Sequence, residues 1–382
     1  MKRRAVLALS ASAALGAVAV PLAAAPAQAA PAATAAPAPG APDAKALAAA
    51  VAGLPGADAT SALVRVGGSG GSWHGSGGVH DLDSGRAADE HARFRAGSTT
   101  KVVTAAAVLR LAADGRLNLN APVQRYLSGL FHGTAFHHPV SVRQLLDHTS
   151  GIQPGDGWGE SFAEVYAHRF DVFPVRRVVA SALAKGPEFR PGRQQHYLNI
   201  NYTLLGMLIE RVTGRPYEEV ATRLVLRPAG MRDTSFPGDD PLIHGPHNRG
   251  YQRVGGEFVD VTEWVQSDRW AAGDMISTTA DLEHLLTSLF RGRIVPAPQL
   301  REMFRLPPGV EGATMSAGLE RLTVDGTVYW GKSGARYGYA SALAATRDLS
   351  RTVVYCVGAT DAKAEGTNPV AQRIIMAATA DA

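Results

Sequence analysis

Two patterns of apolar and polar positions divide the chain. Short apolar runs typical of β-strands lie near both ends, and apolar residues spaced three and four apart, typical of helices, fill the middle. The predicted strands span residues 61–66, 79–83, 92–95, 318–324, 327–330, 339–345 and 352–358. The predicted helices span residues 44–51, 98–113, 117–126, 141–149, 173–184, 201–212, 217–225, 279–290 and 369–380. The Gly/Ser-rich stretch 67–78 is predicted as a long loop.

This order of elements predicts an α/β fold, in which one sheet is built from the two ends of the chain and an all-helical insertion lies between them. We expect the α/β part at residues 44–115 and 310–382 and the helical part at residues 116–309. A length of 382 residues suits one large two-part fold or two domains.

The first 43 residues have the composition of a targeting segment followed by a linker. Residues 1–29 combine Lys2-Arg3-Arg4, an apolar Ala/Leu/Val stretch and the small-x-small site Ala27-Gln28-Ala29, which together predict a cleaved secretory signal. The pair Arg3-Arg4 leaves the twin-arginine route open beside general secretion. The apolar run is too short and too Ala-rich for a membrane span. Residues 30–43 are an Ala/Pro-rich linker, so we expect a secreted, extracellular protein.

Composition narrows the class of protein further. With 46% hydrophobic and 19% charged residues the chain is globular, and its net charge of +4 is dispersed, which argues against nucleic-acid binding. Cys356 is the only cysteine, so no internal disulfide can form, and its apolar neighbours predict a buried strand residue. We expect a monomer. The chain contains only six lysines, so each one carries information.

The first candidate for chemistry lies where a predicted helix begins. Ser98 is at the N-terminus of the 98–113 helix, and Lys101 follows one turn later on the same face. A serine hydroxyl is a poor nucleophile until a nearby base takes its proton, and a lysine close to other cations has a lowered pKa and can share that task. The ordinary alternative is a helix cap beside a solvated lysine.

Two distant segments offer complementary groups. Tyr197 and Asn199 stand two residues apart before a predicted helix, and the Tyr197 phenol can carry a proton if nearby lysines lower its pKa. Asn199 offers a donor and an acceptor to an amide. The run Lys332-Ser333-Gly334-Ala335 presents a cation and a hydroxyl, and its glycine permits close backbone approach. Taken alone, Tyr197 and Asn199 are better explained as a core tyrosine beside a helix N-cap, and Lys332 as an exposed lysine on a hairpin.

The order S-x-x-K, Y-x-N, K-S-G resembles that of the serine penicillin-recognising enzymes. The chain is similar to the class C β-lactamases and secreted D-alanyl-D-alanine carboxypeptidases, and most similar to the Streptomyces DD-peptidases, over residues 61–380. Further stretches that carry this resemblance are residues 145–151, 201–214 and 272–278. The resemblance implies an antiparallel sheet formed by the N- and C-terminal segments, flanked by helices, with the helical insertion of a β-lactamase/transpeptidase fold.

The resemblance also implies a catalytic set. Ser98 would be acylated, Lys101 and Tyr197 would together take its proton and return it to the leaving amine, and Asn199 would hold the substrate amide. Backbone N–H groups of Ser98 and Ala335 would form the oxyanion hole.

The same resemblance assigns the carboxylate of the substrate to the K-S-G segment. Lys332 would attract this carboxylate with help from Ser333, and would favour a deprotonated Tyr197. Gly334 completes the substrate-binding run with Ala335. Arg321, on the neighbouring predicted strand, is an alternative second carboxylate ligand, although a surface arginine is the simpler interpretation.

The sequence therefore predicts a serine hydrolase that forms an acyl-enzyme, with D-Ala-D-Ala carboxypeptidase activity on peptidoglycan-type peptides as the leading hypothesis. A β-lactamase and an esterase are alternatives with the same chemistry, so a small peptide, a β-lactam or peptidoglycan is the expected partner. A penicillin-binding sensor without turnover is an alternative of another class. A metal hydrolase built on His132, His137 and His138 is disfavoured because H-E-x-x-H spacing is absent, and no metal or other cofactor is expected.

Overall fold

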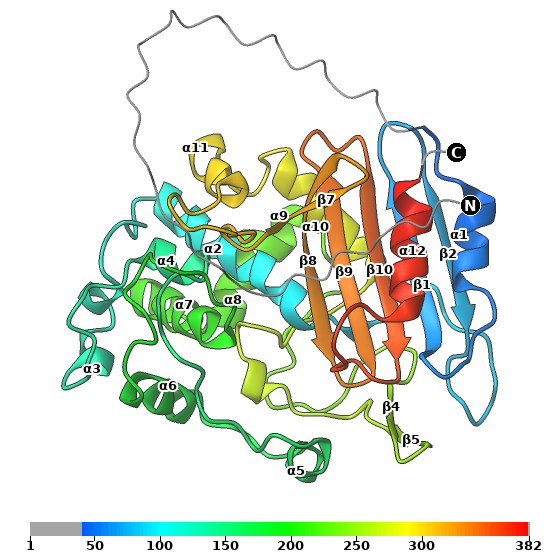
Figure 1. Ribbon diagram of the computed structural model, residues 1–382, viewed down its shortest axis with the longest axis horizontal. Helices are drawn as coiled ribbons and strands as arrows, with labels where there is room; N and C mark the ends of the chain where they lie inside the picture. Colours follow the sequence, from blue (N-terminus) through cyan, green and yellow to red (C-terminus); the bar gives the residue numbers. More distant parts are fainter. Residues whose placement is uncertain (1–39, 381–382) are drawn as a thin grey trace, which may run out of the picture. The chain divides into compact units, whose positions relative to one another are not determined.

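A six-stranded antiparallel sheet is the centre of the protein, which we describe from a computed structural model over residues 40–380. Its order is β2-β1-β10-β9-β8-β7 (Figure 1). The strands are β1 Ala59–Gly67, β2 Trp73–Gly78, β7 Glu320–Val324, β8 Thr327–Arg336, β9 Tyr339–Thr346 and β10 Thr352–Ala359. The predicted signal at residues 1–29 and most of the predicted linker lie outside the described residues.

The two ends of the chain meet in the middle of this sheet. Strand β1 pairs antiparallel with β10, so that Val64 lies opposite Tyr355 and Val66 opposite Val353. The predicted fold class, a sheet from the terminal segments joined to a helical part, is confirmed.

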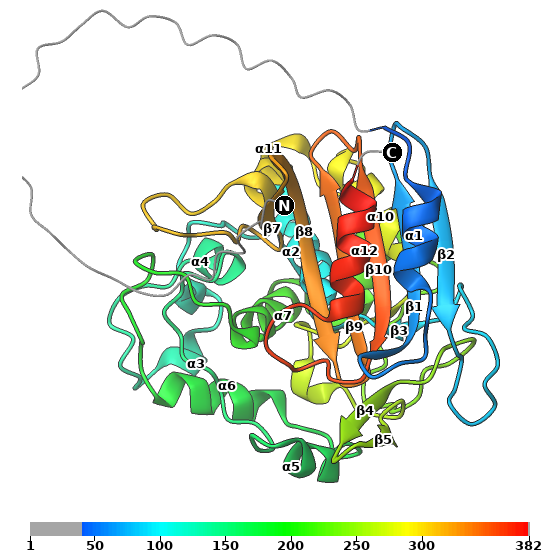
Figure 2. The same ribbon diagram turned by 45° about the vertical axis from the view of Figure 1, so that its right-hand side comes forward.

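Each face of the sheet carries its own apolar core. Helices α1 (Ala44–Val51) and α12 (Pro369–Thr379) cover one face, where Leu47 and Ile374 are fully buried (Figures 1 and 2). Helices α2 (Thr100–Ala113) and α10 (Thr279–Phe290) belong to the larger core on the other face. This arrangement buries the sheet on both sides and leaves the end of β8 beside the start of α2.

Helix α2 is buried almost all round. Its Ala- and Val-rich sequence presents little polar surface, as expected of a helix at the centre of a fold. A short 3₁₀ turn, Gly97–Thr99, precedes it, and the helix ends at Asp114-Gly115 as predicted. Ser98 therefore lies at the entrance of the most buried helix.

The helical part packs around α7 (Asn199–Thr213) and α4 (Val142–Leu146). Ser141 caps α4 as predicted, in a capping box with Gln144. The other helices of this part are α3 Ser128–Phe131, α5 Phe162–Ala167, α6 Val175–Ala184, α8 Tyr217–Ala221, α9 Arg227–Ala229 and α11 Ala297–Leu300. No helix within residues 40–380 has the length and apolar character needed to cross a membrane.

The structure corrects several local predictions. The insertion is not wholly helical, because it contains the hairpin β4–β5 (Tyr251–Val254, Glu257–Asp260) and strand β6 (Ile276–Ser277), which pairs with β3 (Phe94–Arg95). Residues 117–126 form only one 3₁₀ turn, since a residue before proline, here Ala121, disfavours helix. Residues 79–83 make a single β-bridge instead of a strand, and residues 73–78 are a strand instead of a loop.

Candidate active site

Two glycines bring the start of α2 against the end of β8. Gly97 has φ +55°, and a Cβ on it would lie 2.7 Å from the Ala335 nitrogen. A Cβ on Gly334 would collide with the Ala96 carbonyl oxygen and lie 3.0 Å from the Ser98 nitrogen. These close approaches bring the backbone around Ser98 and Ala335 together, and the two backbone N–H groups remain the predicted oxyanion hole.

The three predicted catalytic side chains meet at the Ser98 hydroxyl. The Tyr197 hydroxyl donates a hydrogen bond to Ser98 Oγ at 2.7 Å, and Lys101 Nζ lies 3.1 Å from the same oxygen. Lys101 Nζ also donates to Asn199 Oδ1 and to the Ala272 carbonyl oxygen, both at 2.7 Å. Residues separated by a hundred positions in the sequence thus form one hydrogen-bonded cluster.

Burial changes the protonation chemistry of Lys101. The side chain is completely buried, and this burial, together with the charge of Lys332, lowers the pKa of the Lys101 ammonium well below its ordinary value. A neutral amine has two N–H bonds and one lone pair. Because Asn199 Oδ1 and the Ala272 oxygen accept the two N–H bonds, the lone pair faces Ser98 Oγ, and Lys101 can accept the serine proton.

Tyr197 differs from the expectation that neighbouring lysines lower its pKa. Lys101 Nζ lies 4.9 Å and Lys332 Nζ 4.6 Å from the centroid of the Tyr197 ring. Burial nevertheless dominates and raises the pKa of the Tyr197 phenol to about 12. Tyr197 is therefore a neutral proton donor to Ser98 in the resting site, and the prediction of a deprotonated Tyr197 is wrong.

His148 is a residue whose contacts the sequence did not reveal. Its carbonyl oxygen accepts from the His196 nitrogen at 3.0 Å, and its Nδ1 accepts from the Leu198 nitrogen at 3.3 Å. It therefore binds the backbone on both sides of Tyr197, and its ring lies 4.7 Å from the Tyr197 ring. In the sequence, residues 145–151 were noted only for their resemblance to the family. The separation of His148 and Tyr197 along the chain gives no indication that they are in contact.

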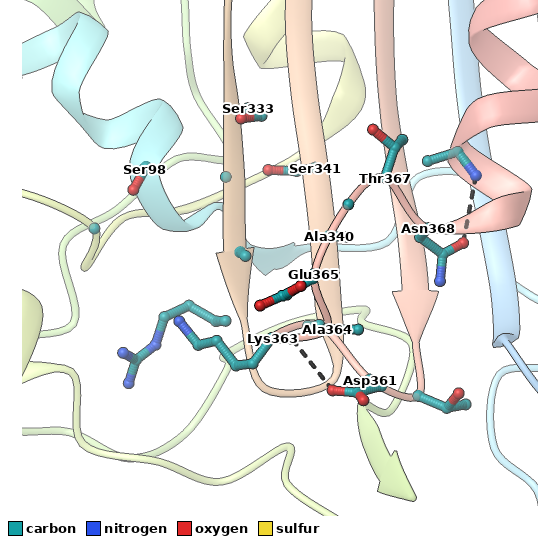
Figure 3. A pocket seen from close by; sticks show the side chains of 18 of the residues that line it. Ser98, Ser333, Ala340, Ser341, Asp361, Lys363, Ala364, Glu365, Thr367 and Asn368 are labelled. Atoms are coloured by element: carbon teal, nitrogen blue, oxygen red, sulfur yellow. Dashed lines mark hydrogen bonds between the residues drawn. The ribbon is translucent and has the colours of Figure 1, made fainter. Parts of the chain in front are cut away.

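A cavity of about 530 Å³ opens in front of this cluster. Figure 3 shows Ser98 at the start of α2 and Ser333 on β8, with the loop that carries Lys363 and Glu365 crossing in front of the strands. The predicted substrate-binding residues Asn199, Lys332, Ser333, Gly334 and Ala335 all line this cavity.

The cavity leaves out Arg321, the alternative carboxylate ligand. Arg321 lies on β7 opposite Trp330 of β8, as predicted, but is exposed and does not line the cavity. Lys332, by contrast, is buried, and burial lowers the pKa of its ammonium.

Neither a metal centre nor a reactive thiol competes with the serine site in the part of the chain that the structure describes. Across residues 40–380 no group of three or more His, Cys, Asp and Glu side chains could hold a metal ion, and His132, His137 and His138 form no such group. Cys356 is buried in β10, as predicted, and burial raises the pKa of its thiol.

Solved structures with similar folds include several amidohydrolases. A D-stereospecific amidohydrolase from Streptomyces sp. is 29% identical, with a TM-score of 0.76 over 88% of this chain and 99% of that one. A D-amino acid amidase from Ochrobactrum anthropi, solved with D-phenylalanine, has a TM-score of 0.70 over 87% of this chain and 98% of that one. At 24% identity the second likeness concerns the fold alone.

Relatives by sequence match over shorter stretches. Esterase EstB of Burkholderia gladioli is 36% identical over 176 residues, 43% of this chain and 43% of the esterase. Protein flp of Staphylococcus aureus (strain COL) is 29% identical over 213 residues, 54% of this chain and 40% of the relative. The chain thus spans less than half the length of either relative. The sequence profile of the family described as Beta-lactamase matches residues 25–374, and the chain therefore belongs to the β-lactamase family of serine hydrolases.

Proposed function

We propose that this serine hydrolase is a D-alanyl-D-alanine carboxypeptidase acting on peptidoglycan-type peptides outside the cytoplasm. The observation that carries the proposal is the position of Lys332 and Ser333, directly before the Gly334-Ala335 segment that faces Ser98 on β8. A cation and a hydroxyl there suit a terminal carboxylate one residue beyond the scissile bond. Five basic and three acidic side chains line the cavity, which also favours an anionic substrate.

Acylation follows from the hydrogen bonds around Ser98. Ser98 Oγ attacks the carbonyl carbon of the penultimate residue while its proton passes to the lone pair of Lys101. The carbonyl oxygen gains negative charge and is stabilised by the backbone N–H groups of Ser98 and Ala335, each donor being worth about 3 kcal/mol in comparable sites. The Asn199 side-chain amide nitrogen is available to orient the substrate's preceding amide, because its oxygen is held by Lys101.

Departure of the terminal residue needs a proton on its nitrogen. The Tyr197 hydroxyl supplies this proton, and the ammonium of Lys101 then restores the phenol, so that no net charge is left on Tyr197. The ammonium groups of Lys101 and Lys332 beside the Tyr197 ring stabilise the transient phenolate. Water then hydrolyses the acyl ester by the same proton path in reverse.

A D-stereospecific amidase or an esterase is the second candidate. The specific observation in its favour is the 29% identity to the Streptomyces D-stereospecific amidohydrolase over nearly all of that protein, followed by the local match to EstB. An amidase or esterase of this kind would use the same acyl-enzyme chemistry. It would differ from a carboxypeptidase because its leaving group would not need a carboxylate for binding at Lys332. A β-lactamase and a non-hydrolysing sensor differ in how fast the acyl group leaves.

One comparison of substrates tests the proposal. We expect the purified protein to release D-alanine from an N-acyl-D-Ala-D-Ala peptide faster than ammonia from the matching D-alanine amide, because only the peptide places a carboxylate at Lys332. Intact-mass spectrometry after addition of benzylpenicillin, repeated over time, measures acylation and its loss. Ser98→Ala should abolish both, whereas Ser84→Ala, an exposed control, should not. Faster cleavage of the amide would favour the amidase, and a permanent adduct without peptide turnover would favour the sensor.

The proposed location has its own test. Protein recovered from the culture medium should begin at Ala30 on N-terminal sequencing, because the predicted signal ends at Ala29. Recovery of the uncleaved chain from the cytoplasm alone would contradict secretion.

A further inference from the structure

A second group of cations that line the same cavity lies around one carboxylate, that of Asp268. Arg336 makes two hydrogen bonds to Asp268, at 3.2 and 3.3 Å, and Arg269 Nε lies 3.6 Å from the same carboxylate. Lys363, from the loop after β10, lines the cavity beside both arginines. We call these four residues the Asp268 cluster.

Positive charge in the Asp268 cluster exceeds negative charge. Asp268 is the single acidic side chain that forms an ion pair with any of the three cations within residues 40–380, so three cations face one carboxylate. Lys363 lies on the exposed loop after β10 and makes no ion pair among the described residues, so the three cations share Asp268 as their counter-ion. An anionic ligand would relieve the repulsion between the cations.

One member of the cluster offers its charge to the cavity. The Arg336 side chain is only 3% exposed and is occupied by Asp268, whereas the Arg269 side chain is 33% exposed. A Cβ on Gly273 would lie 3.4 Å from Arg269 Cβ and 3.7 Å from the Ser98 nitrogen. The backbone that carries Arg269 therefore lies close to the backbone of the nucleophile. Arg269 Nη1 donates a hydrogen bond to the Asp268 carbonyl oxygen at 3.3 Å, and the remaining N–H groups of this guanidinium, which lines the cavity, can bind a carboxylate.

Strand β8 shows which half of the substrate meets the cluster. Lys332 and Ser333 come before the Gly334-Ala335 segment that faces Ser98, and Arg336 comes after it. At a rise of about 3.3 Å per residue, Lys332 and Arg336 are roughly 13 Å apart along the strand. A peptide lying along β8 with its leaving residue at Lys332 therefore points its acyl half toward the Asp268 cluster.

We infer that Arg269 and Lys363 form a subsite for a carboxylate on the acyl half of the substrate. The preferred peptide then carries one carboxylate on each side of the scissile bond. This inference rests on the proposed function, because that function fixes the leaving residue at Lys332. Glu365, on the same loop as Lys363, is exposed and makes no ion pair with it among the described residues (Figure 3). The negative charge of Glu365 would favour an amine on the acyl half of the substrate, so the experiment includes a peptide with a cationic acyl end.

Three substrates with the same scissile bond separate these charges. They are the N-succinyl, N-acetyl and N-β-alanyl forms of D-Ala-D-Ala, whose acyl ends are anionic, neutral and cationic. We expect kcat/KM for D-alanine release to be about tenfold higher for the succinyl than for the acetyl peptide, and lowest for the β-alanyl peptide. The succinyl preference should shrink as salt is raised, because part of the cluster is exposed.

Variants locate the effect. Arg269→Gln and Lys363→Gln should each bring the succinyl-to-acetyl ratio toward one. Arg253→Gln removes a cavity-lining positive charge that forms no ion pair with Asp268 and should keep the parental ratio. Should Arg269→Gln fail to fold, Lys363→Gln, at a more exposed position, decides the matter.

The outcomes keep the two claims apart. Equal kcat/KM for the three peptides, a preference for the β-alanyl peptide, or an unchanged ratio in folded variants would overturn the subsite while leaving the carboxypeptidase standing. If none of the peptides releases D-alanine, the proposed function is wrong and the subsite falls with it.

Discussion

At the scale of single residues, the site depends on a lysine that burial keeps from being charged. The two N–H bonds of the neutral Lys101 amine are accepted by Asn199 and Ala272, and its lone pair faces Ser98 Oγ. Tyr197 remains a protonated phenol because burial, which raises its pKa, outweighs the hydrogen bond with Ser98 and the charge of Arg269, which lower it. The lysine therefore takes the proton, and the tyrosine gives one.

The activity should follow the titration of Lys101. Because the pKa of Lys101 is lowered, the amine is neutral at a pH where an ordinary lysine is charged, and acylation should fall as the pH drops through that lowered pKa. Ionisation of Tyr197 should cause no loss until the pH approaches about 12. The measurement is the rate of acylation by benzylpenicillin from pH about 5 to about 10. Lys101→Arg, which stays charged, should be inactive throughout; a parental rate in that variant would rule out Lys101 as the base.

His148 provides a second test at this scale. It adopts φ +61°, a conformation that asparagine tolerates well, and Asn Oδ1 can replace Nδ1 as the acceptor for the Leu198 nitrogen. His148→Asn should therefore acylate within a few-fold of the parent, whereas His148→Phe keeps a ring without an acceptor and should lose about 10- to 100-fold. Thermal unfolding measured in parallel identifies a general loss of structure. Equal loss of acylation in both variants would mean that the acceptor does not position Tyr197.

At the scale of elements, the sequence predicted those parts of the fold whose pattern is set by burial. Helix α10 was predicted at its observed bounds, and α2 at its observed end, because their apolar residues face a core. Strand β2 was missed because half of its residues are glycine. A Cβ on Gly77 would collide with the Val51 carbonyl oxygen of α1, so tertiary packing selects a residue that lacks strand propensity.

The same reason explains the predicted early end of β8. The predicted strand ended at Trp330, yet β8 continues to Arg336, where Gly331 and Gly334 admit neighbouring backbone. The chemical residues of the site were identified from ordered motifs and resemblance. Their pKa directions, and the contacts of His148, depend on three-dimensional burial, which no local pattern records.

The junction of α2 with β8 yields a prediction about Gly97. Gly97→Ala places a methyl group 2.7 Å from the Ala335 nitrogen and should push β8 away, lowering acylation by about 100-fold or more. Gly115→Ala is the matched control, since Gly115 also has positive φ but no atom near its Cβ. It should cost about 1 kcal/mol of unfolding free energy and leave acylation unchanged. Acylation at the parental rate in Gly97→Ala would show that the backbone N–H groups of Ser98 and Ala335 need not lie so close together.

At the scale of the whole molecule, one buried acid makes stability depend on pH. Burial raises the pKa of Asp274 to about 7, and its Oδ1 has no hydrogen-bond partner among the described residues. A carboxyl whose pKa is raised on folding favours the folded state at low pH, and this contribution is lost as the pH rises through that pKa. Asp274→Asn should therefore stabilise the fold by about 2 kcal/mol more at pH 8 than at pH 5.

Urea unfolding of parent and variant at the two pH values measures this difference. Asp81→Asn is a suitable control, because hydrogen bonds from Ser84 lower the pKa of the half-buried Asp81, so its replacement should not give a gain that grows with pH. An equal effect of Asp274→Asn at both values would place the carboxyl in a more solvated environment than the structure describes.

The pairing of β1 with β10 has a consequence for the order of biosynthesis. Thr60 and Gly358 share a hydrogen bond although 298 residues separate them, and Ser341 holds the Ala96 carbonyl oxygen beside Ser98 across 245 residues. The nucleophile is thus translated early, while the strand that supplies Lys332 and the oxyanion amide of Ala335 emerges near the end. Non-local pairing of this kind delays folding until the last strands are available. A chain cut short before β10 would contain Ser98 and Lys101 yet lack the sheet that makes them reactive, so Ser98 of a nascent or truncated copy cannot be acylated.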